Sequence, residues 1–452
     1  MSTLAFGGEV RDHPIESVSQ LTDLYRRSFK PPSQHRIGLE LEAMPVLSTG
    51  MPVPYASKQG PNIRSLLEEM GSTPGVQRAM ESGHLIGLSD EHGTISLEPG
   101  GQVEFSSRPA RDLHEVNTLV EGHLHRLRRA CDATGLHWIE QGYQPFARLS
   151  QMEWMPKERY RIMQAYLPTR GRLALRMMSQ TSSIQCSFDF SDESDMEHKF
   201  RTANRVTPLV QAITANSPFH RGRPGRYLSH RTKIWEDTDP DRCGLLPMAF
   251  GKESLIEQYV EYALDVPMMF LTRGGRWIPM QGRSFRRMLK DGYEGSLPTL
   301  EDWGLHLSGI FAQVRLKSFV EVRAHDLLPE DLAMAVPALW KGILYDRDAL
   351  DAACELMSDV SFEQAAGLMT AVARRGLGLR FLGRPLLERA RQLVQIASDG
   401  LKRQGQTGPG GDDERRFLGP VESLLDRGQT PADALLERYQ GEWAGDLRRA
   451  IL

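Results

Sequence analysis

Cysteine is scarce in this sequence. Its 452 residues include four cysteines, which are widely spaced and form no CxxC pair: Cys131, Cys186, Cys243 and Cys354. This spacing excludes a disulfide-stapled scaffold and a structural zinc site of the common kinds. An ordinary hydrophobic core must hold the fold together, and a hydrophobic fraction of 40% is sufficient for one.

Long apolar runs and an excess of one charge are also missing. No stretch approaches the roughly 20 apolar residues of a membrane span, and Glu9 and Arg11 interrupt the N-terminal segment before a signal-peptide core can form. The 55 Lys and Arg against 58 Asp and Glu leave a formal net charge of -3, which gives no global attraction to nucleic acid or to an anionic membrane. We therefore expect a cytoplasmic protein that acts on small molecules, with no nucleic acid or membrane partner and with its oligomeric state left open.

The chain shows no internal repeat at a fixed period and one linker-like stretch. Residues 404–413 (QGQTGPGGDD) combine glycine, proline and polar residues, which predicts a flexible loop. A helical pattern precedes this loop and another follows it, opening at Thr430-Pro431 with a cap and a proline at the first helical position. We expect residues 414–452 to form a helical segment packed on a single domain that spans residues 1–452.

Four segments alternate apolar and polar residues, the pattern of strands with one buried face. They are residues 36–42, 94–106, 183–189 and 314–323. Within the second segment, Pro99-Gly100-Gly101 supplies turn chemistry and predicts a hairpin. Each of these strands therefore presents one polar face.

The polar faces carry many glutamates: Glu40, Glu42, Glu98, Glu104 and Glu321. Solvent exposure alone would account for each strand taken singly, because antiparallel sheets commonly wet one face. Glutamate is depleted in strands, however, and like charges stacked on one face repel each other. A bound cation would remove the repulsion, and an all-oxygen ligand set without a Cys or His cluster favours Mg²⁺, with Mn²⁺ as the alternative.

Basic residues beside Glu321 indicate what such a metal would hold. Arg315, Lys317 and Arg323 share its strand face. Magnesium usually shares its shell with phosphate oxygens, and a neighbouring Arg or Lys neutralises charge on a transferred phosphoryl group. The sequence contains neither GxxxxGK[ST] nor a kinase glycine loop followed by a lysine strand, which disfavours P-loop and protein-kinase folds. The remaining option is an open sheet whose polar face binds the nucleotide.

Other polar residues are less specific. Arg231 and Trp235 are suited to clamp a substrate carboxylate against an aromatic wall, although such a pair is more often a surface stack. His92, His220 and His230 lie in turn-like polar contexts, where a histidine is usually just solvated. We assign these histidines no role.

Ordered segments along nearly the whole chain resemble one enzyme family. They are RIGLELE (36–42), ISLEPGGQVEFS (95–106), SIQCSFDFSDESDMEHKFR (183–201), ANSPF (215–219), LSHRTKIWEDTDPDRCGLLP (228–247), YVEYALDVPM (259–268), LPTLEDWGLHLSGIFAQVRLKSFVEVRAHD (297–326) and GQTPADALLERYQGEW (428–443). In these segments the chain is similar to glutamate-cysteine ligases of the plant and proteobacterial type, which are carboxylate-amine ligases related to glutamine synthetase.

This resemblance implies an α+β fold, in which helices surround a curved, mostly antiparallel sheet of the glutamine synthetase type. It also implies one catalytic domain, whose concave sheet face holds ATP and magnesium. The implied reaction transfers the γ-phosphate of ATP to the γ-carboxylate of glutamate, and the cysteine amine then captures the acyl phosphate. The product is γ-glutamylcysteine, on the route to glutathione or a related thiol.

The resemblance also implies roles for individual residues. Five glutamates would bind magnesium: Glu40, Glu42, Glu98, Glu104 and Glu321. Lys317 and Arg323 would contact ATP, and the glutamate contacts would be Arg231, Trp235 and Gln185. Arg323, which would steady the moving phosphate, and Glu98 are the expected catalytic residues.

The chain departs from the family pattern at several positions. Leu39, Leu41 and Ala43 stand where the family's first motif (G-T-E-H-E-K) has Thr, His and Lys, and Met269 stands where it commonly has Tyr. Residues 279–282 (PMQG) replace a Cys-Thr-Gly segment. These differences leave open an ATP-dependent ligase that uses another amine. A non-catalytic relative is the third hypothesis, although it has no physical reason to keep repelling carboxylates together.

Overall fold

The computed structural model describes residues 13–452. The N-terminal charges that argued against a signal peptide lie outside the described residues. Within residues 13–452, no helix combines the length and the apolar character needed to cross a bilayer.

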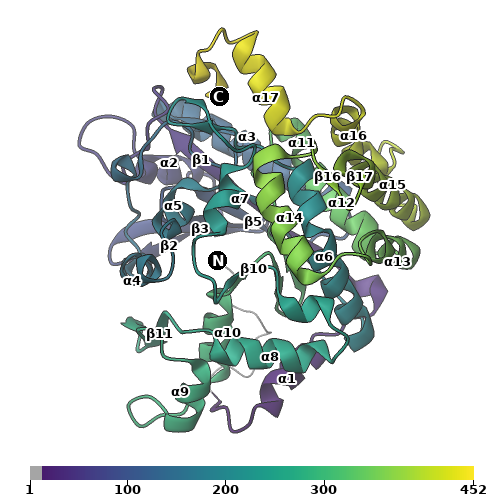
Figure 1. Ribbon diagram of the computed structural model, residues 1–452. Helices are drawn as coiled ribbons and strands as arrows, with labels where there is room; N and C mark the ends of the chain where they lie inside the picture. The colour runs from purple at the N-terminus through teal and green to yellow at the C-terminus, as the bar shows by residue number, and fades with distance from the viewer. Residues whose placement is uncertain (1–12) are drawn as a thin grey trace.

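A nine-stranded antiparallel sheet lies at the centre of the described chain (Figure 1). Its strand order is β14-β15-β7-β1-β5-β4-β3-β2, and β6 pairs with the end of β1. The bounds are β1 Ile37–Val46, β2 Gln77–Glu81, β3 His84–Asp90, β4 Gly93–Leu97, β5 Val103–Ser107, β6 His137–Ile139, β7 Ile184–Phe188, β14 Val314–Leu316 and β15 Val320–Val322. The sheet thus places β1 between β5 and β7, which come about 65 and 145 residues later in the chain. The sheet is therefore held together by contacts between segments that are distant in sequence.

Smaller ladders and helices surround this sheet. The two-stranded ladders are β8 Phe219–His220 with β9 Arg223–Pro224, β10 Cys243–Gly244 with β13 Phe311–Ala312, β11 Phe270–Arg273 with β12 Arg276–Pro279, and β16 Arg380–Phe381 with β17 Arg384–Pro385. The helices are α1 Ser19–Arg26, α2 Ile63–Met70, α3 Leu113–Thr134, α4 Glu158–Tyr166, α5 Ala174–Gln180, α6 Glu193–Ile213, α7 His230–Trp235, α8 Leu255–Asp265, α9 Phe285–Asp291, α10 Leu300–Ser308, α11 Glu330–Ala333, α12 Ala335–Leu344, α13 Arg347–Leu356, α14 Phe362–Arg375, α15 Leu386–Gln404, α16 Gly419–Asp426 and α17 Pro431–Gln440.

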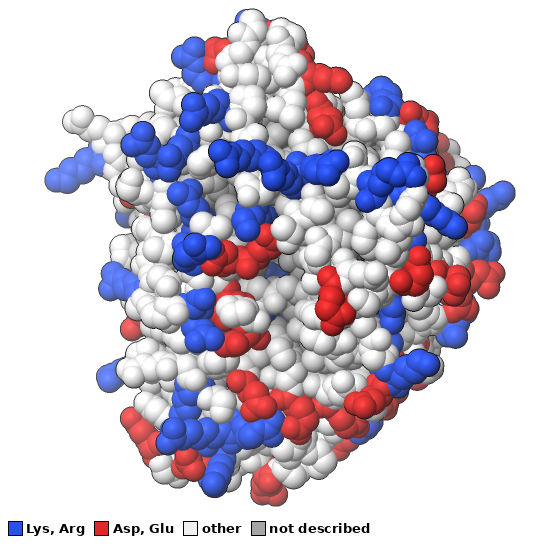
Figure 2. Space-filling model, in the orientation of Figure 1, with Lys and Arg blue, Asp and Glu red and all other residues white. Residues whose placement is uncertain are grey.

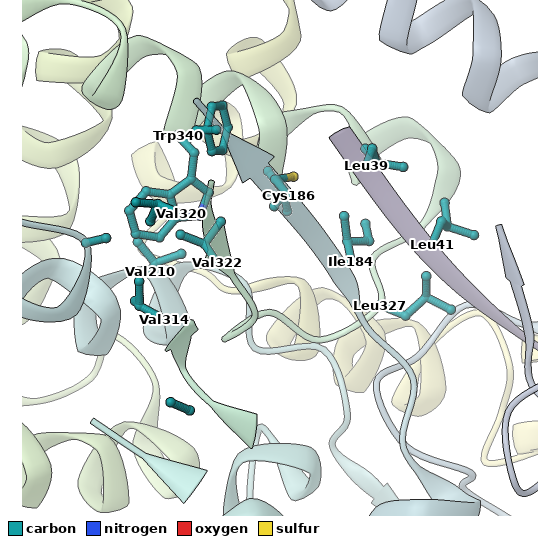
Figure 3. Packing of buried hydrophobic residues seen from close by; sticks show 14 of the residues in the cluster. Leu39, Leu41, Ile184, Cys186, Val210, Val314, Val320, Val322, Leu327 and Trp340 are labelled. Atoms are coloured by element: carbon teal, nitrogen blue, oxygen red, sulfur yellow. The ribbon is translucent and has the colours of Figure 1, made fainter. Parts of the chain in front are cut away.

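The core lies on the apolar face of the sheet. Leu39 and Leu41 of β1 and Cys186 of β7 point to this face, where Val210 of α6 and Trp340 of α12 pack nearby (Figure 3). Because side chains alternate along a strand, burying these residues sends the intervening glutamates and glutamine to the other face. Each fully buried large apolar side chain stabilises the fold by roughly 1.5–3 kcal/mol.

The predicted strand over residues 314–323 is wrong in one respect: it is a hairpin of two short strands. β14 turns back into β15, so that Arg315 stands directly opposite Glu321. The intervening loop has an odd number of residues, and the alternation of apolar and polar positions therefore continues through the turn. Period alone does not distinguish one long strand from this hairpin.

The C-terminal residues pack as helices on the body of the protein, which agrees with the expected helical layer (yellow in Figure 1). Thr430 caps α17 as predicted: its hydroxyl accepts from the Asp433 N–H (3.1 Å), and the Asp433 carboxylate accepts from the Thr430 N–H (2.8 Å). Buried Glu414 accepts a hydrogen bond from the Leu113 N–H (2.7 Å) and pairs with Lys341. The flexible loop at residues 404–413 and the single-domain organisation stay predictions.

Candidate functional site

The polar face of the sheet gathers the predicted glutamates through strand register. Glu42 of β1 stands directly opposite Glu104 of β5, and Glu40 stands opposite Gln185 of β7. Gln185 donates to the Glu42 carboxylate (3.1 Å). Two carboxylates directly opposite each other on one face repel, so this register concentrates negative charge.

Glu98 joins the same face from the turn between β4 and β5. Its N–H donates to the Gln102 carbonyl (2.9 Å). A Cβ on Gly100 would lie 2.1 Å from the Ser179 carbonyl oxygen, so only glycine allows this close approach. The Tyr160 hydroxyl of α4 donates to the Leu97 carbonyl (2.6 Å) and lies 3.4 Å from the Glu98 carboxylate, which therefore faces α4.

The charges of three glutamates on this face are poorly compensated. Burial, together with repulsion from Glu104 and Glu321, raises the pKa of Glu40 to about 7. Burial, with Glu104 and Glu98 nearby, raises the pKa of Glu42 to about 8. The pKa of Glu104 is raised as well, by burial and by Glu98. Such a group of carboxylates fits a divalent cation, which would favour their ionised forms.

Glu321 has a different environment. Burial alone would raise its pKa, but Arg315, Lys317 and Arg323 hold that pKa well below its usual range. The carboxylate accepts from Arg315 Nε (2.5 Å), Lys317 Nζ (3.0 Å) and Arg323 Nη1 (3.2 Å). Glu321 therefore already has three cationic partners, and its role as a metal ligand stays a prediction.

The ligand geometry of a metal site is not formed by these side chains as they stand. Within the part of the chain that the structure describes, no three His, Cys, Asp or Glu side chains are grouped closely enough to hold one ion. Magnesium keeps several waters and uses few protein ligands. Magnesium binding at these carboxylates therefore stays a prediction.

A cavity opens on this face and collects six of the predicted residues. Its lining includes Glu42, Glu98, Gln185, Arg231, Trp235 and Arg323. Of the remaining predicted residues, Glu40 lines the neighbouring cavity described below, while Glu104, Glu321 and Lys317 are buried in the sheet. The structure thus brings together residues that are separated by up to about 280 positions in the sequence.

Arg231 is presented to the cavity by the short helix α7. Its guanidinium lies 5.6 Å from the centre of the Trp235 ring, and its Nη2 donates to the Arg323 carbonyl (2.9 Å). Within the described residues, its buried Nε and Nη1 have no hydrogen-bond partner. Burial lowers the pKa of Arg231 to about 10, so the side chain remains charged at neutral pH. Open donors on a buried cation fit an anionic substrate group.

A buried aspartate holds the start of α7 in place. Asp326 accepts hydrogen bonds from Ser217 Oγ (2.6 Å), the Asn216 N–H (2.8 Å) and Ser229 Oγ (2.8 Å). Ser229 is also the N-cap of α7, accepting from the Thr232 N–H (3.0 Å). Asp326 therefore fixes the position from which Arg231 reaches the cavity.

The contribution of α4 to the cavity was not predicted from the sequence. Arg159 and Tyr160 line it beside Glu98, and Met163, Met177 and Met178 give it an apolar wall. Arg159 Nη2 lies 3.9 Å from the Glu98 carboxylate. The available signal was the polar run KERY (157–160) between apolar residues, which resembles an ordinary helix start and is not specific.

A second cavity, of about 500 Å³, lies at Glu40, where the central cavity has Glu42. Its lining includes three basic residues, Lys30, Arg36 and Arg108, with serine hydroxyls on neighbouring strands and the ring of Phe319. Lys30 is paired with Asp189 (2.6 Å). Cationic side chains, hydroxyls and an aromatic ring are groups with which proteins bind nucleotides. The three basic residues were not predicted, because single Lys and Arg near strand ends are common on any surface.

Comparison with known proteins gives one consistent family. A family model described as glutamate-cysteine ligase family 2 matches residues 36–452. The chain is 39% identical over 418 residues to the chloroplastic glutamate-cysteine ligase of Brassica juncea, a match that covers 92% of this chain and 79% of the relative. It is 38% identical over 450 residues to the chloroplastic glutamate-cysteine ligase B of Oryza sativa subsp. japonica, which covers 97% and 88%.

The fold is shared with a solved ligase structure. Glutamate-cysteine ligase from Francisella tularensis, in complex with AMP, superposes with a TM-score of 0.54 over 91% of this chain and 86% of that one. The sequence identity is 14%, so this likeness concerns the fold. It confirms the predicted arrangement of helices around an antiparallel sheet.

The cytoplasmic prediction is wrong. It depended on the lack of an apolar N-terminal segment, whereas the relatives from Brassica juncea, Oryza sativa and Arabidopsis thaliana are named as chloroplastic proteins. Targeting to an organelle does not require a long apolar segment, so the absence of one does not indicate the cytoplasm.

Proposed function

This chain belongs to glutamate-cysteine ligase family 2, and we propose that its two cavities bind different substrates of the ligase reaction. The chain is an ATP-dependent ligase that forms γ-glutamylcysteine from glutamate and cysteine. The observation that carries the proposal is that Glu42 lines the central cavity, while Glu40, two residues earlier on the same face of β1, lines the second cavity. A phosphoryl group that moves between two substrates needs their reacting ends to lie close together.

Glutamate binds in the central cavity. The open donors of Arg231 match its α-carboxylate, and Trp235 forms the wall beside that guanidinium. Bound in this way, the substrate directs its γ-carboxylate towards the glutamates of β1. Gln185, which contacts Glu42 and Arg323, is placed to orient the reacting end.

ATP binds in the second cavity, with its phosphates directed to Glu40. Lys30, Arg36 and Arg108 line this cavity, with Lys30 paired with Asp189 (2.6 Å) and Arg108 with Glu115 (2.5 Å). Arg323 lines the central cavity, and Lys317 pairs with Glu321. Glu40, Glu42, Glu98 and Glu104, with Glu321, would hold magnesium, which when bound neutralises phosphate oxygens and favours phosphoryl transfer.

Arg323 acts on the moving phosphate. The γ-carboxylate oxygen of glutamate attacks the γ-phosphorus of ATP, the bond to the bridging oxygen breaks, and ADP leaves with those electrons. Arg323 is held in place by Gln185 and Glu321 and neutralises charge on the transferred group. The cysteine amine then attacks the acyl carbon, phosphate leaves with the electrons of the broken C–O bond, and the nitrogen loses a proton to give the amide. Cysteine enters beside the methionine-lined wall, which suits its thiol.

The Glu98→Gln substitution tests this assignment. It keeps the shape of the side chain and removes its charge, so we expect turnover, measured as phosphate release with ATP, glutamate and cysteine, to fall on the order of a hundredfold or more. Thermal unfolding should be nearly unchanged, because Glu98 makes few contacts besides Tyr160 and Arg159.

The matched control is Glu91→Gln, on the exposed turn between β3 and β4, where the carboxylate is 88% accessible. It should leave the rate unaltered. Wild-type turnover in Glu98→Gln would refute the metal assignment, whereas equal rates with alanine or ammonia in place of cysteine would refute the placement of the acceptor.

A further inference from the structure

A third cavity lies behind α7, outside the site described above. It has a volume of about 700 Å³. His230, Lys233 and Ile234 of α7 line it, while Arg231 and Trp235 of the same helix line the central cavity. One short helix therefore forms a wall of both cavities.

This cavity is strongly basic. Arg176, Arg223, Arg226 and Lys233 line it, and no Asp or Glu is among its lining residues in the described chain. Lys233 pairs with Glu236 (2.9 Å), but the structure of residues 13–452 shows no ion pair for the three arginines. Figure 2 shows Lys and Arg side chains in a band across the upper half of the face that carries α7 and α14. Uncompensated cations around one hollow attract an anion.

Three rings in this cavity form a compact cluster, in which Tyr143 also lies 6.0 Å from His220 between centroids. Tyr143 stacks on His230 (5.6 Å between centroids), and His230 stacks on His220 (5.5 Å). The β8–β9 hairpin places His220 directly opposite Arg223. A Cβ on Gly225 would lie 2.1 Å from a carbon of the His230 ring, so the glycine is what leaves room for this ring. The hairpin and the glycine thus allow these rings to lie together.

The histidines add no positive charge at neutral pH. Burial, together with repulsion from any protonated His230 and from Arg221, Arg176 and Arg223, lowers the pKa of His220 to about 4. Burial lowers the pKa of His230 as well, and its Nδ1 lies 2.8 Å from the Ser217 carbonyl oxygen. Both rings are therefore neutral, and the cavity offers arginine forks beside flat, uncharged rings.

We propose that this basic cavity binds a small anion of the phosphate-ester class, and that α7 links its occupancy to glutamate binding. Arginine forks match phosphate oxygens in a bidentate manner, and the cluster of rings offers flat faces to a planar group attached to the phosphate. Free phosphate and a nucleoside phosphate share this chemistry. The second half of the proposal rests on the proposed role of Arg231, whereas the first half does not.

Calorimetry with the full chain tests binding without turnover. Inorganic phosphate and ADP are titrated separately, in the absence of magnesium, into wild type and into the double variant Arg223→Ala/Arg226→Ala. We expect the double variant to bind one anion fewer per chain, or to bind it at least tenfold more weakly. Tighter binding of ADP than of phosphate at this site would identify a nucleotide as the ligand. An equal stoichiometry and affinity in both proteins would overturn the proposal.

The matched control removes the same charge elsewhere. Arg64→Ala/Arg287→Ala deletes two exposed arginines that are paired with Glu68 (2.9 Å) and Asp291 (3.1 Å). It should bind phosphate as wild type does, and a loss of binding in this control would reduce the effect to net charge and overturn the site.

The link through α7 has its own measurement. Phosphate should shift the KM for glutamate by about fivefold or more in wild type beyond any shift in Arg223→Ala/Arg226→Ala. Product inhibition at the catalytic site affects both proteins and cancels in the comparison. Equal shifts of KM in the two proteins would overturn the link between the basic cavity and glutamate binding. The calorimetric titration, which involves no turnover, would still decide whether the basic cavity binds an anion.

Discussion

At the scale of single residues, the site is defined by which carboxylates have a cationic partner. Glu321 is surrounded by three basic side chains and stays ionised, while Glu40 and Glu42 lie on the same face without such compensation. The same residue type therefore has two protonation behaviours within one sheet. The difference arises from the hairpin, which places Arg315 opposite Glu321 and leaves β1 without a basic neighbour in register.

Magnesium binding is therefore expected to release protons. Because the pKa values of Glu40 and Glu42 are raised to about 7 and about 8, their neutral forms dominate below about pH 6 and their charged forms above about pH 8. Magnesium binds the charged forms, so its affinity should rise with pH through this range and level off only above the pKa of Glu42, about 8.

Calorimetric titration of magnesium at pH 7, in two buffers with different ionisation enthalpies, measures the protons released. Glu42→Gln should release fewer protons than wild type. A magnesium affinity that is constant from pH 6 to pH 8 would contradict the expectation.

At the scale of secondary structure elements, the turn between β4 and β5 decides where Glu98 stands. Gly100 fits against the Ser179 carbonyl, and Gln102 ties the turn to the end of α5 by donating to the Thr181 carbonyl (2.8 Å). The turn is thus fixed to a neighbouring element and not only to its own hairpin.

Gly100→Ala should displace this turn. The added Cβ meets backbone, which has little freedom to move, so we expect a loss of stability of about 1–3 kcal/mol and a lower turnover because Glu98 shifts. Urea unfolding and phosphate release measure the two effects.

The control is Gly122→Ala in α3, where a Cβ meets nothing within 4 Å and the helix should gain up to about 1 kcal/mol. Equal stability and activity of Gly100→Ala and wild type would show that the turn does not position Glu98.

At the scale of the whole molecule, the C-terminal helices bind together elements that cover the sheet. Glu414 contacts the first residue of α3 and Lys341 of α12. α3 packs against β1, β5 and β6, and α12 packs against β7 and β1. Because both side chains are buried, water cannot replace either partner if the other is removed.

Removing one partner of this pair should therefore be costly. Lys341→Met leaves Glu414 buried with only the Leu113 N–H, and we expect a loss of about 3–5 kcal/mol in the free energy of unfolding. Glu442→Gln breaks the exposed pair with Arg438 and should change it by less than about 1 kcal/mol. Urea unfolding compares the two variants, and similar small losses in both would show that the C-terminal layer contributes little to the fold.

The sequence determined much of the sheet and the list of candidate residues. Alternation predicted β1, β4, β5 and β7, because burying one face of a strand imposes a period of two that depends only on neighbouring residues. The same period placed Glu40, Glu42, Glu104 and Gln185 on the face away from the core. The turn chemistry of Pro99-Gly100-Gly101 predicted the hairpin that carries Glu98.

The contact partners of those residues depend on the tertiary structure. The partners of Glu321, the open donors of Arg231 and the contribution of Tyr160 depend on contacts between segments far apart in the chain, which a local pattern does not contain. His220 and His230 looked like solvated loop residues, yet they stack in a basic cavity because a hairpin and α7 bring them together. Periodicity is a property of neighbours along the chain, whereas charge compensation and cavity lining are properties of neighbours in space.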